Sequence, residues 1–178
     1  SDRRIADEVA TGRPVLAVRV PRGGSGLTVS CHDRDGVVRF SAASPDELTP
    51  LLELLRPREL FVNQLYSFPD VPAMIARILA WRDSLGATLT VAAHDFFPVC
   101  PSYTLLDHRE SFCGIPAASV CAGCLPNHRI GYFLGLYDRA EIGQWRADWQ
   151  QLLYRADRVV FFSESTRVLY FRAYPDLD

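Results

Sequence analysis

Thr88-Leu-Thr-Val-Ala-Ala93 is a short segment in which β-branched and small apolar residues occupy both faces of an extended chain. This pattern is typical of a central strand in a parallel sheet, which helices cover on both sides. Leu60–Leu65 and Arg158–Phe162 are further strand-like segments. The spacing of apolar residues predicts helices over Val71–Leu85 and after Asp138, the expected N-cap residue. Strand and helix therefore alternate, which predicts an α/β fold with a mostly parallel sheet and flanking helices.

The first quarter of the chain carries different signals. A short helix is predicted over residues 3–11 and a strand over Pro14–Val20. Leu27–Cys31 and Val37–Ser41 flank a turn sequence and predict a β-hairpin near the N-terminus. Ser44-Pro-Asp-Glu47 predicts a helix start, with Ser as N-cap, Pro in the first turn and Glu three residues after the cap.

Composition excludes several classes of function. The chain has 178 residues, which suits one domain over residues 1–178, and its net charge of −2 gives no general attraction to nucleic acid. All 19 basic residues are Arg, so Schiff-base and P-loop lysine chemistry are excluded. No apolar run reaches the length of a membrane span, and we expect a cytoplasmic, reducing compartment. Because the sequence starts with Ser rather than Met and leads straight into Asp-Arg-Arg-Ile, we expect the natural N-terminus to lie upstream.

Four of the five cysteines lie close together in the sequence, in the pattern Cys100-x12-Cys113-x7-Cys121-x2-Cys124. They occupy a Cys-rich insertion over residues 96–130, where thiolates could close a tetrahedron around one ion. Four thiolates suit zinc or an iron–sulfur cluster, and zinc is preferred because no redox partner is evident. Four protein ligands leave no open position, so the zinc would be structural. The alternatives are free thiols, or a redox pair formed by the last two cysteines; Cys31 reads as a core residue.

Two pairs of polar residues follow predicted strands. His94-Asp95 comes directly after Ala93, and ligands of open α/β sheets bind at the carboxyl ends of strands. His94 could contact a substrate, and Asp95 could orient its ring or act as a base. The alternative is a strand-end histidine that the backbone satisfies. Ser163-Glu164 opens the last helix, whose N-terminus can hold an anion, although a plain N-cap is the preferred reading there.

Several stretches resemble a group of bacterial family-4-like glycosyltransferases. Thr90–Pro101 resembles the "vHDY…CP" segment of this group, and Leu105–Cys124 resembles its cysteine-rich insertion. Trp145–Val160 resembles the helix and strand that follow, and Ser163-Glu164 with Tyr174-Pro175 resembles the stretch that closes the acceptor-side domain. The match extends from about residue 60 to the end of the chain.

The resemblance implies an enzyme of two facing Rossmann-like halves with the active site between them. This chain would be the N-terminal, acceptor-side half, and a C-terminal half would hold most of the nucleotide-sugar donor. The acceptor would be a saccharide or a lipid-linked glycan, as in polysaccharide biosynthesis, and the full-length protein could associate peripherally with a membrane. His94 would lie near the donor sugar and phosphate, Asp95 on the acceptor side, and Ser163 and Glu164 at the border of the cleft.

The chain departs from the family pattern in three ways. The usual first strand with its glycine-rich loop and the donor half with its paired glutamates are absent, and Phe162 replaces the usual Pro before Ser-Glu. We therefore expect the chain alone to be inactive. The alternative function is a non-catalytic, zinc-stabilised binding or interaction module on a degenerate glycosyltransferase scaffold. A thiol-redox domain ranks last.

Overall fold

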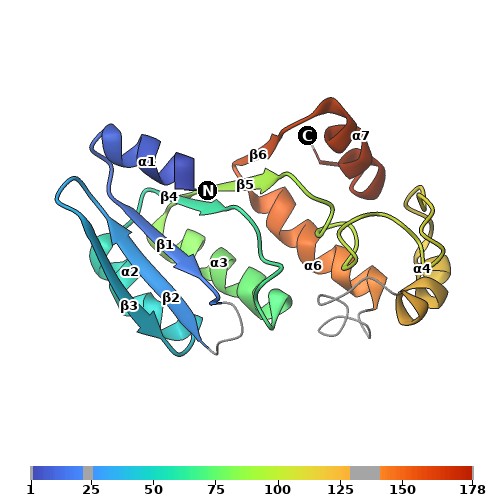
Figure 1. Ribbon diagram of the computed structural model, residues 1–178, viewed down its shortest axis with the longest axis horizontal. Helices are drawn as coiled ribbons and strands as arrows, with labels where there is room; N and C mark the ends of the chain where they lie inside the picture. The colour runs from blue at the N-terminus through green and yellow to red at the C-terminus, as the bar shows by residue number, and fades with distance from the viewer. Residues whose placement is uncertain (1, 22–25, 129–140, 178) are drawn as a thin grey trace. The chain divides into compact units, whose positions relative to one another are not determined.

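The computed structural model describes residues 2–21, 26–128 and 141–177, and this part of the chain is a mixed α/β structure (Figure 1). The chain divides into two compact units, Ser1–Pro57 and Arg58–Asp178. Each unit contains a three-stranded sheet, antiparallel in the first and parallel in the second. The prediction of an α/β fold with a parallel sheet and an N-terminal hairpin is confirmed at this level.

The first unit is built around the antiparallel sheet, whose strands pair in the order β1-β2-β3. Val15 lies opposite His32, and Leu27 lies opposite Ala42. The predicted hairpin is therefore part of a three-stranded meander, because the strand predicted before it joins its edge. The elements of this unit are α1 (Asp2–Ala10), β1 (Val15–Arg19), β2 (Leu27–His32), β3 (Val37–Ala42), η1 (Pro45–Leu48) and α2 (Thr49–Leu55).

The two faces of this sheet differ in character, because successive residues of a strand point to opposite sides. Leu27 and Val29 of β2 are buried, as are Leu48 and Leu52 from the η1–α2 segment. These side chains form the apolar core of the first unit. The alternate residues of β2 are polar, which leaves the opposite face without a comparable core.

The second unit is built around the parallel sheet, whose strands pair in the order β4-β5-β6. The middle strand is buried at every position from Leu89 to Ala93, as its apolar sequence predicts. Helices α3 and α6 lie side by side next to this sheet (Figure 1). They connect β4 to β5 and β5 to β6, and two right-handed connections that advance in the same direction place their helices on the same face of the sheet. The elements are β4 (Glu59–Val62), α3 (Val71–Leu85), β5 (Thr88–Ala93), α4 (Ala118–Cys124), η2 (Leu125–Asn127), α6 (Ile142–Arg155), β6 (Arg158–Phe161) and α7 (Glu164–Ala173).

The predicted ends of two elements need correction, and a third is confirmed. Ser44 is the N-cap of η1 and Pro45 opens it, as predicted; the Ser44 side chain makes no capping hydrogen bond, and Glu47 accepts one from the backbone N–H of Ala43 at 2.9 Å. Glu141 caps α6, because its carboxylate accepts hydrogen bonds from the first free N–H groups of the helix. Asp138, the predicted cap, lies outside the described residues. β4 ends at Val62, three residues before the predicted end.

An aromatic cluster forms the core between α6 and the segment after β5. The ring of Phe97 lies 4.9 Å from that of Trp145 and 5.9 Å from that of Trp149, both edge-on. Such pairs add stability beyond the area that they bury. Within the described ranges, none of the helices combines the length and the apolar composition needed to cross a membrane.

Candidate functional site

His94 marks the point where the buried strand β5 opens to solvent. The three residues before it are buried, whereas His94 is exposed. Its ring lies edge-on to the ring of Phe162, with 6.0 Å between centroids. Phe162 follows the last residue of β6, and Ala93 pairs with Phe161 in the parallel register. The ends of two neighbouring strands therefore meet at His94, as the sequence predicted for the carboxyl edge of the sheet.

Asp95 accepts a hydrogen bond from the backbone with one carboxylate oxygen and faces His94 with the other. Its Oδ1 accepts a hydrogen bond from the N–H of Phe97 at 2.9 Å, which holds the turn after the strand. Its Oδ2 lies 3.8 Å from Nε2 of His94, which is longer than a hydrogen bond. Asp95 thus faces the ring of His94 across this distance, while its other oxygen fixes the turn.

The backbone from Asp95 to Val99 is held by donors from two helices. The hydroxyl of Tyr170 donates to the carbonyl of Asp95 at 2.8 Å, and the hydroxyl of Tyr174 donates to that of Pro98 at 2.5 Å. Two residues of α6 complete the set. Nε1 of Trp145 donates to the carbonyl of Phe97 at 2.9 Å, and Nε of Arg146 donates to that of Val99 at 3.0 Å.

This arrangement makes the segment after His94 rigid, because each carbonyl is fixed by a side chain that is itself packed. Burial raises the pKa of Tyr170, with a further contribution from Asp95, so its hydroxyl remains a donor. The sequence interpretation named Trp145 as part of a family-like helix and did not identify these four donors. Their signal is the residue type, since buried Tyr and Trp need a partner for their polar tips.

Ser163 and Glu164 lie at the carboxyl end of β6, on the same edge of the sheet as His94. The Ser163 hydroxyl accepts a hydrogen bond from the N–H of Thr166 at 3.1 Å and so caps α7. Glu164 is paired with Arg167, and this hydrogen bond lowers the pKa of its carboxyl group. The capping interpretation of Ser163 is therefore confirmed, and both side chains already have partners within α7.

The four cysteines of the insertion lie in one neighbourhood, which the sequence spacing predicted. Cys121 and Cys124 occupy α4, three residues apart and hence on one side of the helix. Burial raises the pKa of the Cys121 thiol, and Arg146 opposes this. The other three cysteines raise it further, so their sulfurs lie within electrostatic range of Cys121. All five cysteines of the chain are free thiols.

Polar groups of the surrounding chain lie beside three of these sulfurs. The Ser102 hydroxyl lies 3.2 Å from the sulfur of Cys100, and Arg146 Nη2 lies 3.9 Å from that of Cys121. Burial raises the pKa of the Cys124 thiol, and the backbone of His108 opposes this. Such outer donors are the usual companions of metal-binding side chains, because they orient the ligand and stabilise its charge.

The backbone of this insertion is strained. Four non-glycine residues of the loop have φ between 53° and 63°, in the left-handed region: Tyr103, Leu105, Glu110 and Ile115. Strain of this kind persists only where surrounding interactions hold it. In the same loop, Nδ1 of His108 is buried and has no hydrogen-bond partner among the residues that the structure describes, which makes it a further candidate metal ligand that the sequence interpretation did not consider.

The predicted zinc site stays a prediction. Within the part of the chain that the structure describes, no group of three or more His, Cys, Asp or Glu side chains is arranged so that it could hold a metal ion. The cysteines are thus neighbours without converging on one point. The donor set fits a thiolate-preferring ion, and the geometry does not display a metal knuckle.

Comparisons of the chain with protein-family models, with curated proteins and with solved structures give no significant match.

Proposed function

We propose that this chain is the acceptor-side half of a glycosyltransferase, which moves a sugar from a nucleotide-sugar to a saccharide or lipid-linked glycan. The observation that carries the proposal is the position of His94 beside Phe162, at the shared carboxyl edge of β5 and β6. Ligands of open α/β sheets bind at this edge. The resemblance of the segments around His94 and Ser163 to bacterial family-4-like glycosyltransferases supports the same assignment, with a Rossmann-like arrangement of the sheet.

The chemistry of the site suits the departure of a nucleoside diphosphate. Negative charge develops on the leaving phosphate, and an imidazole N–H aimed at that charge lowers the barrier. His94 is exposed and its neighbouring backbone is fixed by Tyr170 and Trp145, so the ring is presented from a rigid base. Asp95 faces this ring at 3.8 Å and holds the turn that follows it. A donor-side half would supply the rest of the nucleotide-sugar site.

A structural zinc ion bound by Cys100, Cys113, Cys121 and Cys124 belongs to this proposal. Its support is the electrostatic proximity of the other three cysteines to Cys121, the polar groups beside these sulfurs and the strained loop that carries them. When bound, zinc would fix the loop and would take no part in the reaction, since four thiolates fill its coordination sphere. Arg146 of α6 contacts the insertion at Pro116 and Cys121, and it also donates to the carbonyl of Val99. A fixed loop would therefore also hold the segment that follows His94.

The experiment is a transfer assay on the protein that contains this chain together with a donor-side half. A panel of nucleotide-sugars is supplied with and without saccharide and lipid-linked acceptors, and release of nucleoside diphosphate is measured. The proposal predicts acceptor-dependent release with at least one donor. Binding of the acceptors without release from any donor would favour the alternative, a non-catalytic binding module.

A further inference from the structure

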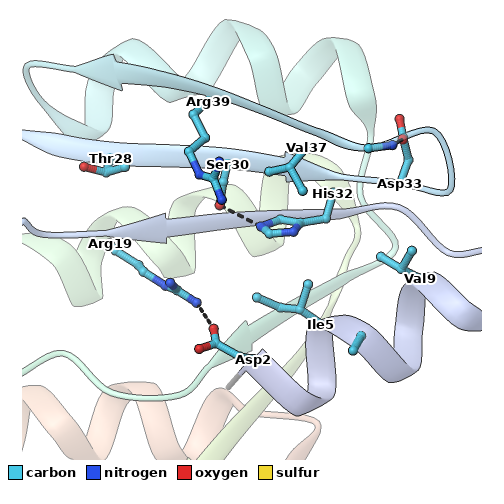
Figure 2. Close-up of a pocket in the computed structure, with 12 residues that line it drawn as sticks. Asp2, Ile5, Val9, Arg19, Thr28, Ser30, His32, Asp33, Val37 and Arg39 are labelled. Atoms are coloured by element: carbon cyan, nitrogen blue, oxygen red, sulfur yellow. Dashed lines mark hydrogen bonds and ion pairs between the residues drawn. The ribbon is translucent and has the colours of Figure 1, made fainter.

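The first unit contains a polar sheet face that the proposed function does not use. Arg19 of β1 lies opposite Thr28 of β2, and Arg39 of β3 lies opposite Ser30. Because alternate residues of a strand share a face, His32 lies on this same side. Three strands thus contribute cationic, hydroxyl and imidazole groups to one surface, which Figure 2 shows beside helix α1.

A hollow of about 450 Å³ lies between this face and α1. Its polar side is the sheet, and its apolar side is formed by Ile5 and Val9 of α1 with Val37 of β3 (Figure 2). A helix normally covers the apolar face of a sheet, so polar residues under a helix are informative. A hollow of this volume with an apolar wall and a few convergent polar groups is typical of small-molecule sites.

Some of the charged side chains that line the hollow are held by ion pairs or hydrogen bonds, and others are not. Arg19 forms an ion pair with Asp2 of α1. The carboxylate of Asp33 accepts hydrogen bonds from the backbone N–H groups of Asp35 and Gly36, which engages it in the β2–β3 turn. Arg39 has no ion-pair partner among the residues that the structure describes. Its guanidinium is therefore the cation that remains available in this hollow.

The hydroxyl groups beside Arg39 are arranged to assist it. Ser30 is buried, with 7% of its surface exposed, and its hydroxyl lies 2.8 Å from Nε2 of His32. The hydroxyl of Thr28 makes no hydrogen bond with any described residue. A guanidinium with neighbouring hydroxyl and imidazole groups matches the oxygens of a phosphate or carboxylate group.

We propose that this hollow binds a small organic oxyanion. Arg39 binds the phosphate or carboxylate group, Thr28 and the Ser30–His32 pair hydrogen-bond to its oxygens, and the organic part lies against Ile5 and Val9. The site is independent of the carboxyl edge at His94, because its residues all belong to the first unit.

The test is a titration followed by amide chemical shifts in NMR, with phenyl phosphate, benzoate and inorganic phosphate as probes. Phenyl phosphate or benzoate is expected to bind saturably and more tightly than inorganic phosphate, with shifts at Thr28, Ser30 and Arg39. Preference between phenyl phosphate and benzoate identifies the oxyanion. Absence of saturable binding for both organic probes would overturn the proposal.

Two variants separate the site from a general effect of charge. Arg39→Gln is expected to weaken binding of the preferred probe about tenfold, because a charge-assisted hydrogen bond is lost. Arg172→Gln removes the same charge from an exposed position of α7 and is expected to leave the affinity unchanged. Thr28→Val gives a second, uncharged test in the hollow. Equal losses in Arg39→Gln and Arg172→Gln, or no loss in both hollow variants, would contradict the proposal.

Discussion

At the scale of single residues, the site depends on side chains that combine an apolar body with a polar tip. Tyr170 and Tyr174 are almost completely buried, yet each hydroxyl reaches a backbone carbonyl of the turn after β5. The carbonyls would otherwise be buried without a partner, which is costly. The rings thus contribute to the core while their hydroxyls set the path of the chain beside His94.

Removing either hydroxyl should therefore destabilise the protein. We expect Tyr170→Phe and Tyr174→Phe each to lower the free energy of unfolding by about 1–2 kcal/mol, because a buried carbonyl loses its donor. Tyr154→Phe is the matched control, since Tyr154 is exposed and its hydroxyl accepts a hydrogen bond from the N–H of Asp176 at the surface. Denaturant unfolding measures all three. Equal effects at the buried and exposed positions would contradict this account.

Some of these residue roles follow from the sequence and others do not. His94 could be placed at the carboxyl edge because the apolar run of β5 ends directly before it. The hydroxyl groups that donate to the carbonyls of Asp95 and Pro98 could not be assigned from the sequence, because they belong to tyrosines 75 and 76 positions further along the chain. Ser44 and Pro45 were correctly predicted to begin a helical segment, whereas the absence of a capping hydrogen bond from the Ser44 side chain could not be read from the sequence.

At the scale of elements, Asp157 joins three parts of the second unit. It lies just before β6, and its Oδ2 accepts a hydrogen bond from the N–H of Leu89 in β5 at 2.8 Å. It also forms an ion pair with Arg82 of α3 at 3.2 Å. The hydrogen bond to Leu89 and the bond from Arg82 lower the pKa of the Asp157 carboxyl group. One carboxylate thus fixes the start of β6 against its neighbouring strand and helix.

This lowered pKa predicts a dependence of stability on pH. A carboxyl group with a lower pKa in the folded state adds stability above its unfolded pKa, and that stability is lost as the pH falls through the folded value. Asp157→Asn should therefore be less stable than wild type at neutral pH, and the difference should shrink below about pH 4. Unfolding measured from neutral to acidic pH tests this. Asp35→Asn, in the exposed β2–β3 turn, is the control, and a difference for Asp157→Asn that does not vary with pH would contradict it.

For the cysteine insertion, the sequence predicts a complete metal site, whereas the geometry of the described residues shows no group that could hold a metal ion. The spacing predicted that the four sulfurs share one ion, and in the structure Cys100, Cys113 and Cys124 lie within electrostatic range of Cys121. The convergence that a metal requires could be neither read from spacing nor found in the described residues.

The zinc proposal predicts a defined stoichiometry. Purified protein should contain one zinc ion per chain, and Cys121→Ser should lose it and become more sensitive to proteolysis between residues 100 and 124, because metal binding is coupled to local folding. Cys31→Ser changes a half-buried thiol in β2 and should retain the ion. Elemental analysis with limited proteolysis measures both. Metal-free wild-type protein with four titratable thiols in this segment would refute the site.

At the scale of the whole molecule, the two units carry different chemistry. The second unit presents His94 at the edge of a parallel sheet, on a turn that four side-chain donors hold. The first unit carries the polar hollow beside α1. The alternation of strands and helices in the sequence predicted the parallel sheet of the second unit, whereas the hollow depends on a register between three antiparallel strands that the sequence alone does not fix.

The most direct test of the proposed function is the turnover of a protein that joins this chain to a donor-side half, compared between wild type, His94→Ala and Arg172→Gln. If His94 stabilises the leaving phosphate, His94→Ala lowers kcat roughly hundredfold, about 3 kcal/mol in the barrier, while thermal unfolding and zinc content stay as in wild type. Arg172→Gln, which removes an exposed charge near the end of α7, retains near-normal kcat. A His94→Ala enzyme with wild-type kcat would show that this histidine has no chemical role and would contradict the assignment of the active edge.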